Sequence, residues 1–255
     1  MNKHIFLVML LLLFVSLKGK ESFIEYFIGT DDSLVIDHAS GSIPHSELNS
    51  DTASVQLVPL DIKLPKPMFA GTPQNIRVTY LEKPLGKPRP PFLAPAGTKN
   101  VALAKRVSSS DEEPIIGELE LSTDGDKEAT DGSYVELGPF LQHITIDLEA
   151  EHDIYAIVIW HFHKQPRVYF DIVVQVADDP DFIMNVRTLF NNDHDNSSGL
   201  SVGQDMHYVE TSEGRLIDAK GVRARYVRFY SNGNSGNDLN HYIEVEVYGK
   251  PADTM

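Results

Sequence analysis

The chain has 255 residues, which is room for one domain with a flanking region or for two small domains. Hydrophobic residues make up 42% and charged residues 23%, so the chain can bury a core and is neither collagen-like nor wholly disordered. The formal net charge of -15 argues against nucleic acid and anionic membranes as partners, because both are bound through Lys and Arg. The chain has no cysteine, which excludes disulfides, thiolate metal sites and cysteine nucleophiles.

The N-terminal residues have the layout of a secretory signal peptide. Lys3 and His4 precede an unbroken apolar run from Ile5 to Val15, which Ser16 to Gly19 follow. That run is too short for a helix that crosses a bilayer, which needs about 20 residues. We therefore expect a signal peptide at residues 1–19, a secreted or periplasmic (cell-envelope) protein, and no stable membrane insertion after cleavage. An uncleaved anchor or a buried helix is the alternative.

Two segments separate this signal from the first regular pattern. Residues 20–58 mix apolar clusters with polar stretches and predict no recognisable unit. Residues 59–99 contain nine of the fifteen prolines. Because each proline fixes its own φ, removes a backbone donor and favours extended geometry in the residue before it, this second segment is expected to be an extended linker or a strap over a neighbour.

From residue 100 to residue 250, short apolar runs alternate with turn signals. The expected strands are residues 143–148, 154–160, 169–177, 225–230 and 243–248. The first and last alternate with period two, and the run at 154–160 is almost continuously apolar. Asp-Gly, Gly-Pro and Asn-Gly turns lie between them, and no long helical period is present. This pattern predicts an all-β sandwich or barrel over residues 100–250.

Residues 123–132 form an acidic loop with four carboxylates and two glycines. Such a loop can fold so that its oxygens converge on Ca²⁺. It is not an EF-hand, because Ala129 and Val135 stand where that loop needs Gly and Glu. A solvated acidic turn, whose Asp-Gly pairs serve only the backbone geometry, fits the spacing as well.

Residues 191–199 form a second polar loop, rich in Asn and Asp with one His. These groups hydrogen-bond sugar hydroxyls and can equally satisfy one another. Asn196-Ser197-Ser198 also fits the sequon for N-glycosylation, which matters only in a eukaryotic secretory pathway.

A pair of histidines ends the apolar strand predicted at 154–160. His161 and His163 flank Phe162, so alternation sends both to the face opposite Trp160 and Phe162. Two histidines on one strand could hold a metal, but no third ligand is evident nearby, which favours polar side chains at a strand end. Arg167 and Tyr169 follow the next turn and could share their surface.

The signatures of the common enzyme classes are absent from the sequence. There is no H-E-x-x-H, P-loop, G-x-G-x-x-G or G-x-S-x-G motif, and Gly233 to Asn237 misses the last of these by its final glycine. Carboxylates are too numerous in so acidic a chain to single out a glycosidase pair. We therefore expect a protein that is not an enzyme.

Six segments occur in a familiar order: residues 100–105, 121–126, 144–148, 157–160, 224–228 and 243–249. Together they resemble the discoidin family, also called the coagulation factor 5/8 type C domain, which overlaps the galactose-binding-like carbohydrate-binding modules. The resemblance covers about residues 100–249 and implies a jelly-roll β-sandwich. Tyr134 stands where the family often has tryptophan, the family's cysteine pair is missing, and Trp160 is expected in the core.

Carried onto this chain, the resemblance implies a calcium site and a ligand surface. The calcium would be held by the acidic turn and a glutamate near the last strand, namely Asp124, Asp126, either Thr130 or Asp131, and Glu244, with Glu246 as the alternate for Glu244. Ligands of such modules lie on loops at one end, where an aromatic ring stacks on a sugar and polar side chains bond its hydroxyls. Here that surface would consist of His161, His163, Arg167, Asn192, Asn240 and His241.

The leading hypothesis is an exported, non-catalytic module that binds a glycan or polysaccharide through loops at one end of a calcium-stabilised sandwich. One alternative is an envelope protein-interaction or structural module without sugar binding, whose partner is another envelope or secreted protein. Exposed apolar groups at residues 23–28 or 65–69 would favour it. The other alternative is an uncharacterised hydrolase, which needs His161 or His163 beside a carboxylate in an open pocket.

Overall fold

The computed structural model describes residues 56–69 and 75–252, which all belong to one compact unit. The expected signal peptide and nearly all of residues 20–58 lie outside this described part. The strands are β1 (Leu57–Pro59), β2 (Leu93–Pro95), β3 (Lys99–Asn100), β4 (Val107–Ser109), β5 (Val135–Leu137), β6 (Gln142–Trp160), β7 (Val173–Ala177), β8 (Arg187–Asn191), β9 (Arg215–Ser231), β10 (Asn240–Tyr242) and β11 (Glu244–Pro251). A single 3-10 turn, η1 (Leu119–Thr123), is the one helical element described. None of the helical structure described is long and apolar enough to span a bilayer.

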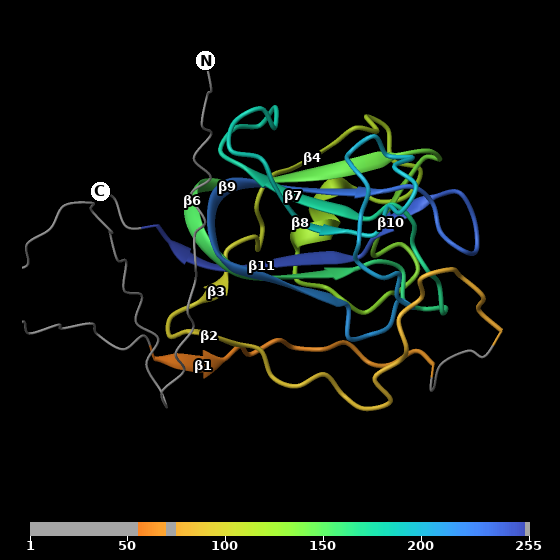
Figure 1. The fold of residues 1–255 in the computed structure, drawn as a ribbon, viewed down its shortest axis with the longest axis horizontal. Coiled ribbons are helices and arrows are strands. Elements are labelled where there is room, and N and C mark those ends of the chain that lie inside the picture. Colours follow the sequence, from red (N-terminus) through yellow and green to blue (C-terminus); the bar gives the residue numbers. More distant parts are fainter. Residues whose placement is uncertain (1–55, 70–74, 253–255) are drawn as a thin grey trace, which may run out of the picture. The chain divides into compact units, whose positions relative to one another are not determined.

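Two long strands, β6 and β9, bend and take part in both layers of a sandwich (Figure 1). One layer contains β4, the first half of β6, the second half of β9, β7 and β8. The other contains β3, β11, the second half of β6 and the first half of β9. All of these pairs are antiparallel, and β5 and β10 form a separate antiparallel pair. The all-β sandwich predicted for residues 100–250 is confirmed.

The strand β6 joins two segments, residues 143–148 and 154–160, that the sequence predicted as separate strands. Its pairing with β9 shifts register between Asp147 and His152, and Glu149 there adopts the left-handed conformation with φ 68°. A bulge of this kind bends a strand without ending it. The alternation is therefore interrupted while the strand continues, and one strand serves both layers.

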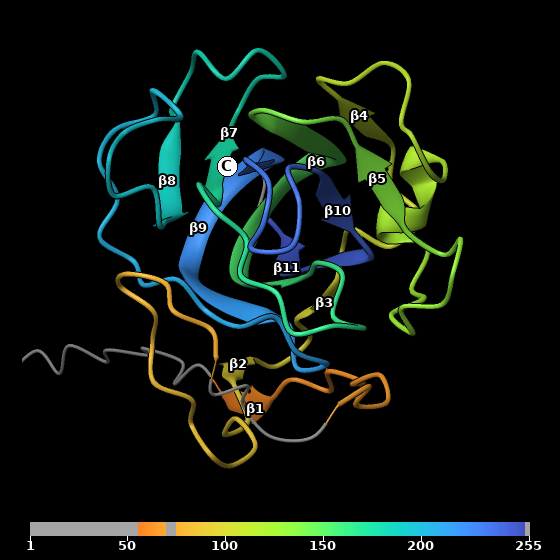
Figure 2. The same cartoon turned by 90° about the vertical axis from the view of Figure 1, so that its right-hand side faces the viewer.

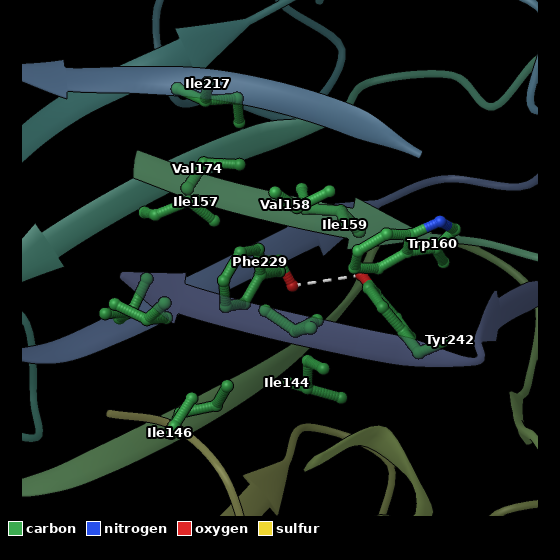
Figure 3. Packing of buried hydrophobic residues seen from close by; sticks show 14 of the residues in the cluster. Ile144, Ile146, Ile157, Val158, Ile159, Trp160, Val174, Ile217, Phe229 and Tyr242 are labelled. Carbon is green, nitrogen blue, oxygen red and sulfur yellow. Dashed lines mark hydrogen bonds between the residues drawn. The ribbon is translucent and has the colours of Figure 1, made fainter. Parts of the chain in front are cut away.

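Apolar side chains from both layers form one core (Figure 3). Ile144 and Ile146 of β6 and Phe229 of β9 are completely buried in it. Trp160 is also completely buried, as the sequence predicted. The Tyr242 hydroxyl donates a hydrogen bond to the Phe229 carbonyl at 3.1 Å, so this polar atom is satisfied inside the core.

The proline-rich segment lies over the outer face of the second layer, and we call its described residues, 56–69 and 75–98, the strap (Figures 1 and 2). Strands β1 and β2 pair within it. Leu60, Ile62 and Phe92 of the strap pack against the core cluster. The second half of β6 therefore has apolar neighbours on both faces, which explains why residues 154–160 are almost continuously apolar instead of alternating.

Hydrogen bonds tie the strap to the loop between β8 and β9. Glu82 donates its backbone N–H to the His207 carbonyl at 2.8 Å and accepts a 2.8 Å ion-pair contact from Arg215. Arg89 donates to the Gly214 carbonyl at 3.1 Å. The strap thus holds the loop that carries Glu210, a residue of the candidate site.

Candidate functional site

The loops that follow β6, β8 and β9 lie at one end of the sandwich, which we call the loop end (Figure 2). They span residues 161–172, 192–214 and 232–239. Each starts where a buried strand stops, so the core fixes the first side chains of each loop. Binding residues are often presented on loops that a rigid scaffold holds in this way.

A buried histidine and glutamate meet at the base of the loop end. His161 Nδ1 lies 3.0 Å from Glu210 Oε2, and both side chains are at most 1% exposed. The ring of Tyr169 stacks on His161 with 4.4 Å between ring centroids. His161 Nε2 and Glu210 Oε1 have no hydrogen-bond partner, although both atoms are buried. Unsatisfied polar atoms of this kind are costly inside a protein, which points to water or a ligand group beside them.

A second histidine and glutamate face each other across the pairing of β5 with β10. Glu136 and His241 are direct register partners, and His241 Nε2 lies 2.9 Å from Glu136 Oε2. Burial, and then the nearby positive charge of Arg167, lower the pKa of His241 to about 3. Burial raises the pKa of Glu136 above its ordinary value. The imidazole is therefore neutral at physiological pH and donates Nε2–H to the carboxyl group.

Arg167 is the half-buried cation of the loop end. Its guanidinium lies 4.9 Å from the centre of the Phe162 ring, and Tyr134 packs against the same ring at 5.1 Å. Nη2 reaches Gln165 Oε1 at 3.4 Å, while Nε and Nη1 have no hydrogen-bond partner. A Cβ at Gly236 would lie 3.4 Å from Nε, so the glycine allows this close approach. The loop end thus combines an unsatisfied cation with an aromatic platform.

The structure brings some of the predicted ligand residues together and separates others. Ring and charge contacts gather three of them, His161, Arg167 and His241, around Tyr169 and Phe162. Of the six, only Arg167 reaches the surface, because the other five residues are at most 2% exposed: His161, His163, Asn192, Asn240 and His241. These five were expected on a ligand surface, whereas they lie beneath it.

The two asparagines and His163 each hold a loop backbone. Asn240 donates to the carbonyls of Gly138 and Phe140, at 2.8 and 3.0 Å. Asn192 accepts the backbone N–H of Ile172 at 2.7 Å. The Nε2 atom of His163 lies 2.9 Å from the carbonyl of residue 127, in the acidic loop. Their contacts position the loops rather than present donors to solvent.

Sequence reasoning did not single out Glu136 or Glu210 as members of this cluster. Glu210 lies in a loop without a repeating pattern, so nothing in the sequence marks it. Glu136 becomes the partner of His241 only through a strand pairing across 105 positions of the chain. Tyr169 was expected beside the two histidines because it follows the next turn, and its ring stacks on His161.

Glu244 is a completely buried carboxylate that faces the acidic loop. Its Oε2 accepts the backbone N–H of Gly125 at 3.1 Å, and its Oε1 has no partner. Burial raises the pKa of Glu244 to about 9, with smaller contributions from the charges of Glu246 and Asp124. A hard cation would remove this penalty, so the orphaned oxygen fits a calcium ligand. Glu246 is already paired with Lys127 at 2.6 Å.

The remaining predicted metal ligands in the acidic loop have hydrogen-bond or ion-pair partners of their own. Asp131 is exposed and pairs with Lys164 at 2.6 Å. Thr130 is exposed, and its carbonyl accepts the Ser133 N–H. Asp126 accepts the backbone N–H of residue 128 at 2.9 Å. Of the predicted side chains in the acidic loop, Asp124 is the one whose charge raises the pKa of Glu244.

A different acidic group lies in the second polar loop. Ligand oxygens of Asp171, Asp193 and Asp195 all lie within 4.8 Å of one another, which no other trio of candidate ligand side chains does in the described residues. Asp193 is completely buried, Asp171 is nearly so, and Asp195 is exposed. This group could hold a metal ion. The sequence suggested a sugar contact for this loop, and the metal-binding arrangement was missed because Asp171 is distant in sequence.

Searches against family models and against curated proteins match nothing. The chain is similar to several solved structures. One is a family 89 glycoside hydrolase from Clostridium perfringens, 21% identical, with 60% of this chain covered and a TM-score of 0.44. A second is a fucose-binding module from Streptococcus pneumoniae, 18% identical, with 59% of this chain and 97% of that chain covered and a TM-score of 0.41. A third is an F-lectin from striped bass serum, 18% identical, with 62% of this chain and 51% of that chain covered and a TM-score of 0.43. The aligned part is 15% of the glycoside hydrolase chain.

Proposed function

We propose that this chain is a non-catalytic module that binds glycans or polysaccharides through its loop end. The observation that carries the proposal is Arg167, a half-buried cation over an aromatic ring whose Nε and Nη1 atoms are buried without a hydrogen-bond partner. Sugars are bound by planar polar groups that bond their hydroxyls and by rings that cover their apolar faces. The loop end offers both.

Arg167 would donate to the sugar hydroxyls, while the half-buried Tyr134 provides the apolar platform and the buried Phe162 ring supports it. The bond between Nη2 and the exposed Gln165 side chain is long at 3.4 Å, so a sugar can displace it at little cost. The pairs His161–Glu210 and His241–Glu136 lie below and fix the rings around the guanidinium. A positioning role suits them because their side chains are closed to solvent, whereas a hydrolase needs such groups in an open pocket.

A structural calcium ion is part of the proposal. The buried Glu244 oxygen, Asp124 and carbonyl groups of the acidic loop would hold it, since Ca²⁺ takes six to eight oxygen ligands. The ion would contribute charge neutralisation and order in the loop. The group of Asp171, Asp193 and Asp195 is the second place where a cation would have this effect.

Export to the periplasm or the medium completes the proposal. It is supported by the apolar run from Ile5 to Val15 after Lys3. A polysaccharide outside the cytoplasm would be the partner, and another envelope or secreted protein would be a second partner.

A glycan array with and without calcium, followed by calorimetry on the best glycan, tests this function. Arg167→Ala should weaken binding by about tenfold or more, because a hydrogen bond to a charged group is lost. Tyr134→Ala should weaken it through loss of the platform. The matched control is Arg187→Ala, an exposed arginine on β8 outside the loop end, which should leave binding unchanged. Unchanged binding in both loop-end variants, with unchanged melting, would remove the assignment.

A further inference from the structure

The hairpin loop between β7 and β8, residues 178–186, is held in one conformation, and we call it the tip. The Asp179 carboxylate accepts the backbone N–H groups of Asp181, Ile183 and Met184, at 3.0, 3.1 and 2.6 Å. These hydrogen bonds hold the pKa of Asp179 below its usual value. Asn185 donates to Asp178 at 2.6 Å. The tip is thus a preformed structure.

An arginine from the neighbouring strand clamps the tip. The Arg228 guanidinium lies 3.9 Å from the centre of the Phe182 ring and donates to the Pro180 carbonyl at 2.8 Å. Phe182 and Asn185 have φ values of 57° and 52°, the left-handed region that most residues avoid. Such strain persists only when the surroundings enforce it, and it is often found where a protein binds something.

The clamped tip presents apolar side chains to solvent. Ile183 is 78% exposed and Met184 is 59% exposed, although hairpin loops are normally polar. A rigid apolar projection gains free energy when a partner covers it. The tip lies at the end of the sandwich where β6 and β9 bend, opposite the loop that precedes β10 (Figure 1). It is therefore separate from the proposed glycan site.

A cavity of about 480 Å³ lies at the foot of the same hairpin. It is lined by Glu151, Asp178, Asn185, Val186, Arg187 and Arg223. Arg187 is exposed and makes no ion pair within the described residues, while Arg223 is paired with Asp153 at 2.9 Å. The cavity thus offers an apolar patch at Val186 beside a cation that lacks a carboxylate partner.

We infer that two copies of this chain associate through this surface, each inserting its tip into the other's cavity. Ile183 and Met184 would cover Val186, and the exposed Asp181 beside them would pair with Arg187 of the second copy. Because projection and cavity lie side by side on one hairpin, a single two-fold axis satisfies both contacts at once. The small size of the tip predicts a weak dimer that forms with rising concentration.

The dimer leaves both loop ends free. They project away from the tips, so one polysaccharide could engage two sites and gain avidity without any new contact. The association itself does not depend on the proposed glycan binding.

Sedimentation velocity from about 5 µM to about 500 µM tests the dimer, a range suited to a weak complex. The wild-type sedimentation coefficient should rise with concentration. Ile183→Asp should weaken dimerisation by at least about tenfold, because a charge would enter an apolar contact. Phe140→Asp is the matched control, since Phe140 is 79% exposed and lies outside the tip. Its dimerisation should equal that of the wild type.

Disulfide trapping tests which residues of the two copies meet. Introduced cysteines can pair only with each other, because the chain has no cysteine of its own. Ile183→Cys mixed with a size-tagged Arg187→Cys should give a mixed disulfide on mild oxidation, and Phe140→Cys mixed with the same protein should not. A monomer at every concentration would overturn the inference, as would a dimer that Ile183→Asp leaves intact. Tip-dependent flotation of a monomer with phosphatidylcholine vesicles would assign the tip to membranes instead.

Discussion

The loop end shows how burial fixes the chemistry of single residues. His161 and His241 each lie against a glutamate and are shielded from solvent, so each pair is a buried contact rather than an exposed acid or base. Arg167 differs because it is half-buried and keeps unpartnered donors. Among the predicted ligand residues, burial therefore distinguishes the one cation suited to contact a ligand from the groups that support it.

The first prediction concerns the buried imidazole of His241. Its pKa in the folded protein is about 3, well below the ordinary 6.5, so the unfolded chain takes up a proton first as the pH falls. The free energy of unfolding should therefore decrease from about pH 6.5 downwards, by about 2 kcal/mol from this group at pH 5. His241→Gln should reduce that slope while keeping a donor to Glu136.

Urea unfolding at a series of pH values measures this slope in both proteins. The two curves should diverge below pH 6.5, with the wild type losing more stability. Parallel curves between pH 7 and pH 4 would show that His241 is not a neutral buried base.

At the scale of elements, the position of the strap accounts for the apolar pattern of the second layer. Residues 154–160 are apolar on both faces because the core covers one face and the strap covers the other. The sequence showed each of the two features separately, a continuous apolar run and a proline-rich extended segment. It did not reveal that the second covers the first, because that pairing depends on the tertiary path of the chain.

The second prediction tests whether the strap stabilises the sandwich. Phe92 packs against the core from the strap and is half-buried, so Phe92→Ala should cost about 1 to 2 kcal/mol, less than the 3 to 5 kcal/mol of a fully buried phenylalanine. Leu93→Ala is the matched control, because Leu93 is 53% exposed and should change stability by less than about 0.5 kcal/mol. Equal effects in chemical denaturation would mean that the strap rests loosely on the sheet.

At the scale of the whole molecule, periodicity and family resemblance predicted what depends on local pattern. The all-β class and the buried Trp160 follow from apolar runs, alternation and turn residues. The clustering of Asp171 with Asp193 and the pairing of Glu136 with His241 do not, because each joins distant segments through strand register. Residues such as Asn240 are recognisably polar in the sequence, but whether they face a ligand or a backbone is decided only by the fold.

The last prediction concerns a cation and the stability of the entire sandwich. An ion that binds only the folded state at 100 times its Kd adds about 2.7 kcal/mol, which raises the Tm of a domain of this size by roughly 5 to 10 °C. Calcium should therefore raise the Tm, and a chelator should reverse the change. Glu244→Gln should abolish the increase if the ion lies beside the acidic loop. Asp193→Asn should abolish it if the ion lies in the group of Asp171, Asp193 and Asp195, and a Tm that calcium leaves unchanged in the wild type would remove both sites.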